Sequence, residues 1–163
     1  MVAYAYRFPQ GVVGNVSRNA PNATIEPKFL STTAKPAIGT PVKLVAGVAA
    51  AIAASDANTV VYGILTRAYP TSAGAYTSSN NFGNEVAPDL PAGILKRGYI
   101  TVQNLVGTPA VGGAVYFRNA NGTANNPLGS IEAAASANVV QLLGAYFNGT
   151  ADADGTVEIA YNL

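Results

Sequence analysis

Residues 155–163 read GTVEIAYNL, and large apolar side chains alternate there with small or polar ones. A period of two is typical of a β-strand that buries one face. The apolar positions of this stretch are Val157, Ile159, Tyr161 and Leu163. We expect Val157, Ile159 and Tyr161 to face a core. Asn162 is expected to lie on the surface, where its replacement by Ala should cost little stability.

Four other segments have the composition of strands, and stretches rich in Gly, Pro, Asn and Ser separate them. β-Branched and aromatic residues are frequent in these segments, as in strands that pack against a core. The segments are 59–67 (TVVYGILTR), 98–103 (GYITVQ), 114–118 (AVYFR) and 139–147 (VVQLLGAYF), the last with a kink expected at Gly144. The residues that we expect them to contribute to the core include Ile100, Val102, Val115 and Phe117.

Pro41–Val45 and Val48–Ile52 are predicted to form a hairpin, with an Ala-Gly pair as its tight turn. The Ala-rich stretches 49–57 and 131–137 favour a helix by intrinsic propensity. Helices this short are marginal, however. We therefore expect strand ends followed by loops there, with at most one helical turn near residues 55–58.

Composition points to a thin core. The length of 163 residues suits one domain with a sizeable buried interior, but the hydrophobic fraction of 49% includes 30 alanines, and Trp is absent. A modest number of large apolar side chains fits sheet-on-sheet packing or a small barrel. We expect an all-β fold, a small antiparallel β-sandwich or squat β-barrel over residues 37–163, with an extended N-terminal arm before it.

Residues 1–36 are predicted to form this arm because their pattern differs from the rest. Apolar residues alternate with others over residues 2–8, and a stretch rich in Gly, Asn and Pro follows without any period. Four cations against one carboxylate give residues 1–36 a formal charge of +3, which leaves −2 for the remaining chain. A lone strand cannot satisfy its own backbone groups. The first strand of the arm must therefore lie on a partner or join the domain's own sheet.

The residue types present exclude most common catalytic chemistry. The sequence has no His and no Cys, and charged residues are only 10% of it. It thus lacks a general base of ordinary near-neutral pKa, a thiol nucleophile and a thiolate metal site. Asp152-Ala-Asp154-Gly155 resembles part of a calcium loop, but the Glu needed at the twelfth position is missing, so we interpret it as a turn. We expect no enzymatic activity and no cofactor or metal.

Neither nucleic acid nor a membrane is an expected partner. With a formal net charge of +1, the protein has no strong overall electrostatic field that would attract a nucleic acid or an acidic membrane. The longest apolar stretch, residues 44–54, has 11 residues and is too short to cross a bilayer.

Seven short segments, taken in order, carry a family resemblance. They are 17–18 (SR), 22–26 (NATIE), 61–67 (VYGILTR), 97–102 (RGYITV), 112–118 (GGAVYFR), 144–147 (GAYF) and 157–161 (VEIAY). Together they resemble the structural cement (capsid decoration) proteins of tailed bacteriophages, and only the Ala-rich stretch 48–57 departs from the pattern. The resemblance implies a protein made in the host bacterial cytoplasm. It would bind the major capsid protein on the outer surface of the head and stabilise the expanded shell.

The arm is then the expected capsid-binding element, because strand addition would pair its backbone while its aromatic stripe packs on the partner. The residues predicted to contact the capsid are Val2, Tyr4, Tyr6, Arg7, Phe8, Arg18, Lys28 and Lys35. Unpaired strand edges also predict a homo-oligomer, with a trimer favoured and a dimer as the other possibility.

The alternative is a small β-sandwich module that binds a carbohydrate or a receptor. Such a module would present exposed aromatic side chains on one loop face, and the candidates are Tyr69, Tyr76 and Phe82 in the long polar loop that begins at residue 68.

Overall fold

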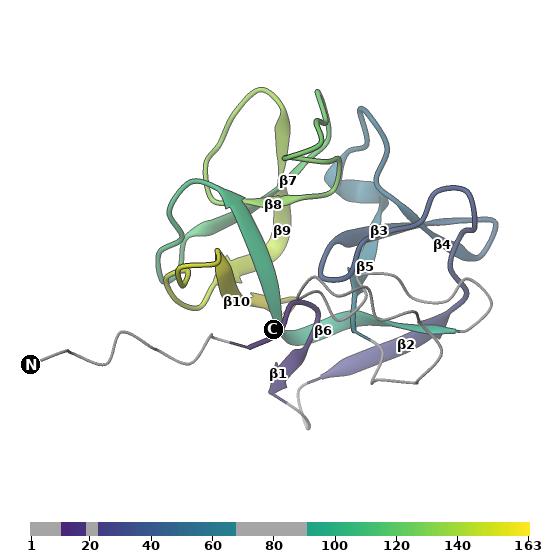
Figure 1. Ribbon diagram of the computed structural model, residues 1–163. Coiled ribbons are helices and arrows are strands. Elements are labelled where there is room, and N and C mark those ends of the chain that lie inside the picture. Colours follow the sequence, from purple (N-terminus) through teal and green to yellow (C-terminus); the bar gives the residue numbers. More distant parts are fainter. Residues whose placement is uncertain (1–10, 19–22, 68–90) are drawn as a thin grey trace, which may run out of the picture.

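The computed structural model describes residues 11–18, 23–67 and 91–163 (Figure 1). These residues form ten β-strands and one short 3-10 turn, η1 (Asn58–Val60), without an α-helix. The strands are β1 (Val16–Arg18), β2 (Thr24–Lys28), β3 (Pro41–Val45), β4 (Val48–Ala51), β5 (Val61–Leu65), β6 (Ala92–Val106), β7 (Ala114–Arg118), β8 (Ile131–Glu132), β9 (Val139–Phe147) and β10 (Thr156–Tyr161). The predicted all-β class is confirmed.

The 15-residue strand β6 belongs to two groups of strands. In Figure 1 it begins in the group of β2 to β5 and continues into the group of β7 to β10. The change occurs at Gly98, which has a φ of +136°. A Cβ at that position would lie only 3.2 Å from the Cα of Ala23. Glycine is therefore required where the strand bends from one group into the other.

The second half of β6 closes a barrel. It pairs with β10 over residues 98–103 and with β8 further on. β10 pairs with β9, β9 with β7, and β7 with β8, so the ring is complete. The predicted barrel is confirmed. We call residues 11–18 and 98–163 the barrel, because β1 pairs with β6 at Tyr99 and Ile100 on this side of the bend.

Large side chains fill the barrel as predicted. All seven residues expected in the core are buried, and Phe147 joins them. The cluster also takes Ile52, Ile64 and Leu95 from the other group of strands, so the two groups share one apolar contact. The seven predicted residues are Ile100, Val102, Val115, Phe117, Val157, Ile159 and Tyr161.

The first half of β6 carries the second group, which we call the small lobe (residues 23–67 and 91–97). β6 pairs there with β2 and β5, β5 with β3, and β3 with β4. The chain after β2 then returns to β4. There the amide of Ala49 donates to the backbone oxygen of Phe29, and the oxygen of Ala49 accepts from the amide of Ser31, both at 2.8 Å. This sheet therefore also comes back on itself. Its core consists of small and branched side chains, namely Leu30, Ile38, Val42, Ala49, Leu65, Ala92 and Ile94.

Several boundaries follow the sequence prediction closely. β7 and β9 have the predicted bounds, and the predicted hairpin is formed by β3 and β4. Its turn residues Ala46 and Gly47 have φ values of 51° and 83°, as a two-residue turn requires. The segment predicted as one strand over 59–67 is instead η1 followed by β5, which ends at Leu65. The 3-10 turn begins at Asn58, the last residue of the stretch 55–58 where a helical turn is allowed, and continues to Val60.

Two expectations need correction. The strand predicted at 98–103 is part of the much longer β6, because Gly98 marks a bend and does not end the strand. Asn162 is exposed, as expected, but it is not a neutral surface position. Its φ is 51°, and its side-chain amide donates to the backbone oxygen of Lys96 at 3.0 Å.

The predicted arm is partly described. Residues 1–10, including the stripe from Val2 to Phe8, lie outside the described residues. Within residues 11–36, β1 and β2 pair with β6, which satisfies their backbone groups inside the chain's own sheets. This part of the segment therefore belongs to the folded unit and does not project from it.

Candidate partner-binding surface

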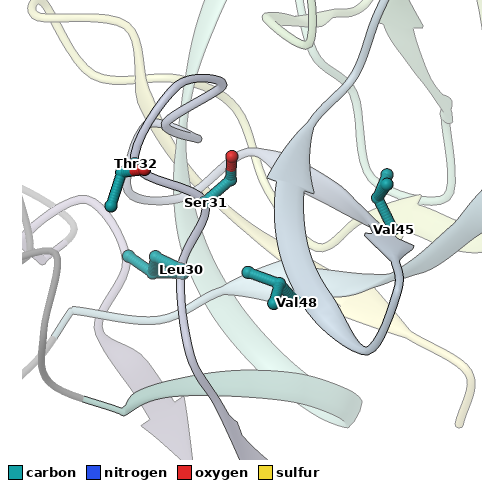
Figure 2. Close-up of a pocket in the computed structure, with 5 residues that line it drawn as sticks. All are labelled: Leu30, Ser31, Thr32, Val45 and Val48. Carbon is teal, nitrogen blue, oxygen red and sulfur yellow. The ribbon is translucent and has the colours of Figure 1, made fainter.

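The small lobe carries an exposed apolar pocket beside the β3–β4 hairpin (Figure 2). Its volume is about 330 Å³, and its lining residues are Leu30, Ser31, Thr32, Val45 and Val48. Leu30 and Ser31 come from the segment that returns to β4, and the two valines lie on either side of the hairpin turn. A two-residue turn places its flanking residues at the tip of the hairpin, which explains why Val45 is 54% exposed.

Phe29, which directly precedes the pocket-lining Leu30 in the chain, is a further exposed apolar residue. Its backbone is fixed by the hydrogen bond that its oxygen accepts from the amide of Ala49, yet the side chain is 59% exposed. An aromatic side chain held on a paired segment and left open to solvent is typical of a contact surface. We call Phe29 and the five pocket-lining residues the pocket face.

Basic residues flank the pocket face. Lys28 precedes Phe29 in the chain, and Lys35 is exposed three residues after Thr32. Lys28 lies 5.5 Å from the centre of the Tyr62 ring, and Lys96 lies 3.4 Å from the same centre. Such contacts hold a cation over an aromatic face without neutralising it.

Tyr62 lies on the rim of the small-lobe core and connects these lysines to Glu26. Its hydroxyl donates to the Glu26 carboxylate, and its backbone oxygen accepts from Lys96. The hydrogen bond to Glu26 is the main cause that raises the pKa of the Tyr62 phenol above its usual range. The phenol therefore stays neutral, and a single carboxylate faces two lysines in this group.

Formal charge divides between the two units. The small lobe has six cations and two carboxylates, a formal charge of +4, whereas the barrel has two cations and four carboxylates, −2. The three ion pairs of the described residues each lie within one unit. These three pairs leave the charge difference between the described parts of the two units in place, and the pocket face lies on the basic unit.

The predicted contact residues do not form one cluster. Val2, Tyr4, Tyr6, Arg7 and Phe8 lie outside the described residues. Lys28 and Lys35 flank the pocket-lining segment in the chain, but Arg18 lies on the barrel. β1 and β2 place Arg18 opposite Tyr99 and Lys28 opposite Ala92, seven residues apart on β6.

Arg18 is engaged within the barrel. Its guanidinium donates to Glu158 at 2.8 Å and stacks 4.1 Å from the centre of the Tyr99 ring. Burial alone would raise the pKa of Glu158, but hydrogen bonds from Ser17, Arg18 and Asn148 outweigh this and lower it. The arginine thus joins β1 to β10, while its side chain stays 53% exposed.

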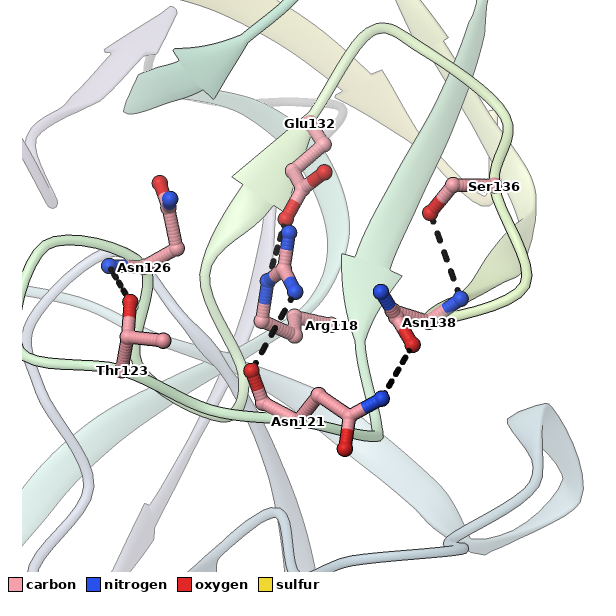
Figure 3. Close-up of polar contacts among 7 residues, drawn as sticks. All are labelled: Arg118, Asn121, Thr123, Asn126, Glu132, Ser136 and Asn138. Carbon is pink, nitrogen blue, oxygen red and sulfur yellow. Dashed lines mark hydrogen bonds and ion pairs between the residues drawn. The ribbon is translucent and has the colours of Figure 1, made fainter.

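The most buried charged group of the described residues is structural (Figure 3). Arg118 on β7 donates to Glu132 on β8 at 2.7 Å, and the two side chains are 10% and 1% exposed. A second guanidinium nitrogen donates to the backbone oxygen of Asn121 at 3.4 Å. The pair joins two barrel strands and anchors the loop between them.

The acidic turn behaves as the sequence indicated. The carboxylate of Asp152 accepts from the amides of Asp154 and Thr156 at 3.1 and 2.9 Å, which is the hydrogen bonding of an Asx turn. Among the described residues, no group of three or more His, Cys, Asp and Glu side chains could hold a metal. No described helix is long and apolar enough to span a membrane.

Sequence reasoning missed the pocket face. The signals were present but weak: Phe29-Leu30 follows a Pro-Lys pair, and Val45 stands directly before the Ala-Gly turn. Neither of these two features indicates that the chain returns to pair with β4. The alternative aromatic site at Tyr69, Tyr76 and Phe82 lies outside the described residues.

Comparison with known proteins gives similarities to a protein family and to solved structures. The family model described as XM1 gp53 minor capsid protein matches residues 1–161. A solved chain from the capsid of Myoviridae phage XM1 has a TM-score of 0.68 and 18% sequence identity, covering 98% of this chain and 95% of that chain. At this identity the structural similarity establishes a shared fold. No curated protein matches the chain.

Proposed function

Since the chain belongs to the XM1 gp53 minor capsid protein family, we propose that it is a decoration protein that cements a phage head. Membership makes it a phage structural protein and part of the virion, so the resemblance found in the sequence is confirmed at that level. The proposal adds the outer surface of the shell as its location, the major capsid protein as its partner, and stabilisation of the expanded shell as its role.

The observation that carries the proposal is the pocket face on a preformed scaffold. Both groups of strands come back on themselves, so their backbone groups are largely satisfied without a partner. Phe29 and Val45 are nevertheless exposed beside a pocket. A rigid module with an open apolar surface suits docking on an assembled surface, because little ordering accompanies binding. The role needs no catalytic residue, in keeping with a sequence that has no His or Cys.

Sedimentation with purified shells tests the function. Expanded, empty heads assembled without this protein should pellet with it at a fixed stoichiometry. The decorated heads should also withstand a higher temperature before they release their contents. Unexpanded heads provide the comparison, since a cement protein should prefer the expanded lattice. Failure to pellet with expanded heads at micromolar protein would refute the proposal.

Strand addition by the first residues is a separate part of the proposal. Deleting residues 1–10 leaves every described strand in place, so the truncated protein should fold. Weaker binding to shells would support contact by Val2, Tyr4, Tyr6, Arg7 and Phe8. Unchanged affinity would count against it. Deleting residues 1–36, by contrast, removes β1 and β2 from β6 and should destabilise the fold.

We further propose that copies of the protein associate with one another. A trimer is favoured over a dimer, and both have a closed rotational symmetry that an icosahedral lattice also offers. Light scattering at high micromolar concentration, alone and after release from shells, measures this directly. A monomer under both conditions would contradict it.

A further inference from the structure

We propose that the small lobe is the side of the molecule that faces the shell. Its pocket face would dock on an acidic protein surface that inserts an apolar side chain. This inference rests on the proposed function and adds the contact surface and the chemistry of the surface it meets. The barrel would then face away from the shell.

The first argument is shape. The pocket lies between two backbone segments that are hydrogen bonded to each other, since Ala49 binds both Phe29 and Ser31 at 2.8 Å. Its walls are therefore fixed before binding. A volume of about 330 Å³ is at the lower end of ligand-site sizes and leaves room for a large apolar side chain. Exposed Phe29 and Val45 would contact the surface around that side chain.

The second argument is charge. The small lobe has a formal charge of +4 and the barrel −2. Lys43 is paired with Asp56 at 2.7 Å, and Glu26 bonds to Tyr62, so the lobe retains cations beyond its internal pairs. Exposed Lys35 and half-buried Lys28 flank the pocket-lining segment. An acidic partner surface complements this side and is repelled by the other, which would orient the molecule during encounter.

The barrel provides the natural comparison because it also exposes apolar residues. Leu143 on β9 is 59% exposed and Val111 is 75% exposed. They belong, however, to the unit of negative charge, which carries Asp152 and Asp154 in an open turn. If apolar exposure alone decided docking, the two sides would be equivalent. Charge favours the small lobe.

Two matched pairs of single variants test the inference by measuring affinity for expanded shells. Val45→Glu and Lys35→Glu alter the small lobe, whereas Leu143→Glu and Asp154→Lys make comparable changes on the barrel. All four side chains are exposed, so folding should change little, and circular dichroism and thermal unfolding check this. We expect the small-lobe variants to lose about tenfold or more in affinity. The barrel variants should stay within about twofold of wild type.

Salt provides a second readout. Binding of the wild-type protein should weaken as ionic strength rises, and Lys35→Glu should bind with a smaller salt dependence. Loss of binding in the barrel variants alone, or an equal loss in all four, would overturn the inference. If wild type binds and all four variants bind equally well, the function stands and only the inference is wrong. If wild type does not bind shells, the proposed function fails and the inference falls with it.

Discussion

The barrel and the small lobe share strand β6, but they differ in the side chains that fill their cores. The barrel half of β6 is surrounded by large side chains, and Phe117 and Phe147 are among the largest fully buried residues. The small-lobe half faces a core that includes Ala49 and Ala92, and its hairpin leaves valines in the open. Closure thus encloses a core with aromatic side chains in one unit and a core of smaller aliphatic side chains in the other. We therefore expect truncations in the barrel core to cost more stability than truncations in the small lobe, which we propose as the contact side.

Removing one partner of the buried ion pair should have the largest effect. Arg118→Met leaves Glu132 buried without its cation, and a loss of roughly 3–5 kcal/mol in unfolding free energy is expected. Lys43→Met in the small lobe should cost only about 1 kcal/mol, because its pair is more exposed and Asp56 keeps its bond from the Ala53 amide. Chemical denaturation measures both values.

The double change Arg118→Met with Glu132→Gln is the control for this comparison. It removes the uncompensated charge and should recover part of the loss. Equal losses of stability on breaking the barrel pair and the small-lobe pair would contradict the expectation that the more buried ion pair costs more to break.

Truncating the two cores comes next. Ile159→Ala should destabilise the protein by roughly 2–5 kcal/mol because the residue is fully buried in the barrel. Val42→Ala in the small lobe removes less volume and should cost about 2 kcal/mol. Leu163, which is 45% exposed, is the control and should change stability by less than about 0.5 kcal/mol on replacement by Ala. A Val42→Ala cost above that of Ile159→Ala would reverse the ranking of the cores.

Removing one of the hydrogen bonds that join the two units should have a smaller effect. Asn162→Ala loses the bond to Lys96. It also places alanine, whose side chain cannot form a local hydrogen bond, at a φ of 51°. A loss of about 1–2 kcal/mol in unfolding free energy is expected. Asn162→Gly keeps the backbone conformation accessible and should cost less, as thermal unfolding would show. A greater cost for Gly than for Ala would mean that backbone strain plays no part.

The Glu158 network should give the smallest effect, visible as a pH dependence. Its pKa is lowered in the folded protein, so its stabilising contribution is present above the carboxyl's ordinary pKa and is lost as the pH falls through the lowered value. Wild type should lose stability below about pH 5 faster than Glu158→Gln. Parallel pH profiles for the two proteins would show that the network does not couple to folding.

Sequence patterns predicted the two units unequally, and the residues explain why. Barrel strands such as Val157–Tyr161 alternate large and small side chains, so their faces were assigned correctly. Ala49, Ala50 and Ala51 of the small lobe carry no such contrast, although two of the three are buried. Nothing local in the sequence indicates that residues 29–31 pair with β4. The bridge joins Leu30 to Ala49 in parallel, and the whole of β3 lies between them in the chain.

Gly98 had a similar effect on the prediction. Its position before a strand-like segment suggested a boundary, whereas its tertiary role is to let one strand bend between two units. The pocket face depends on the same kind of information. Phe29 and Val45 are apolar, and only the closed sheet shows that they remain outside it.

The position of β6 also determines the order in which the protein can fold. Its partners include β1 and β2 near one end of the chain and β10 near the other, with Val16 opposite Ile100 and Thr156 opposite Gln103. Pairings this distant in sequence close slowly, because loop entropy must be lost before the contacts form. A ribosome-bound chain can assemble the β3–β4 hairpin early, but the barrel can close only after residue 161 has emerged. Pairing of β10 with β6 is therefore the step that completes the barrel.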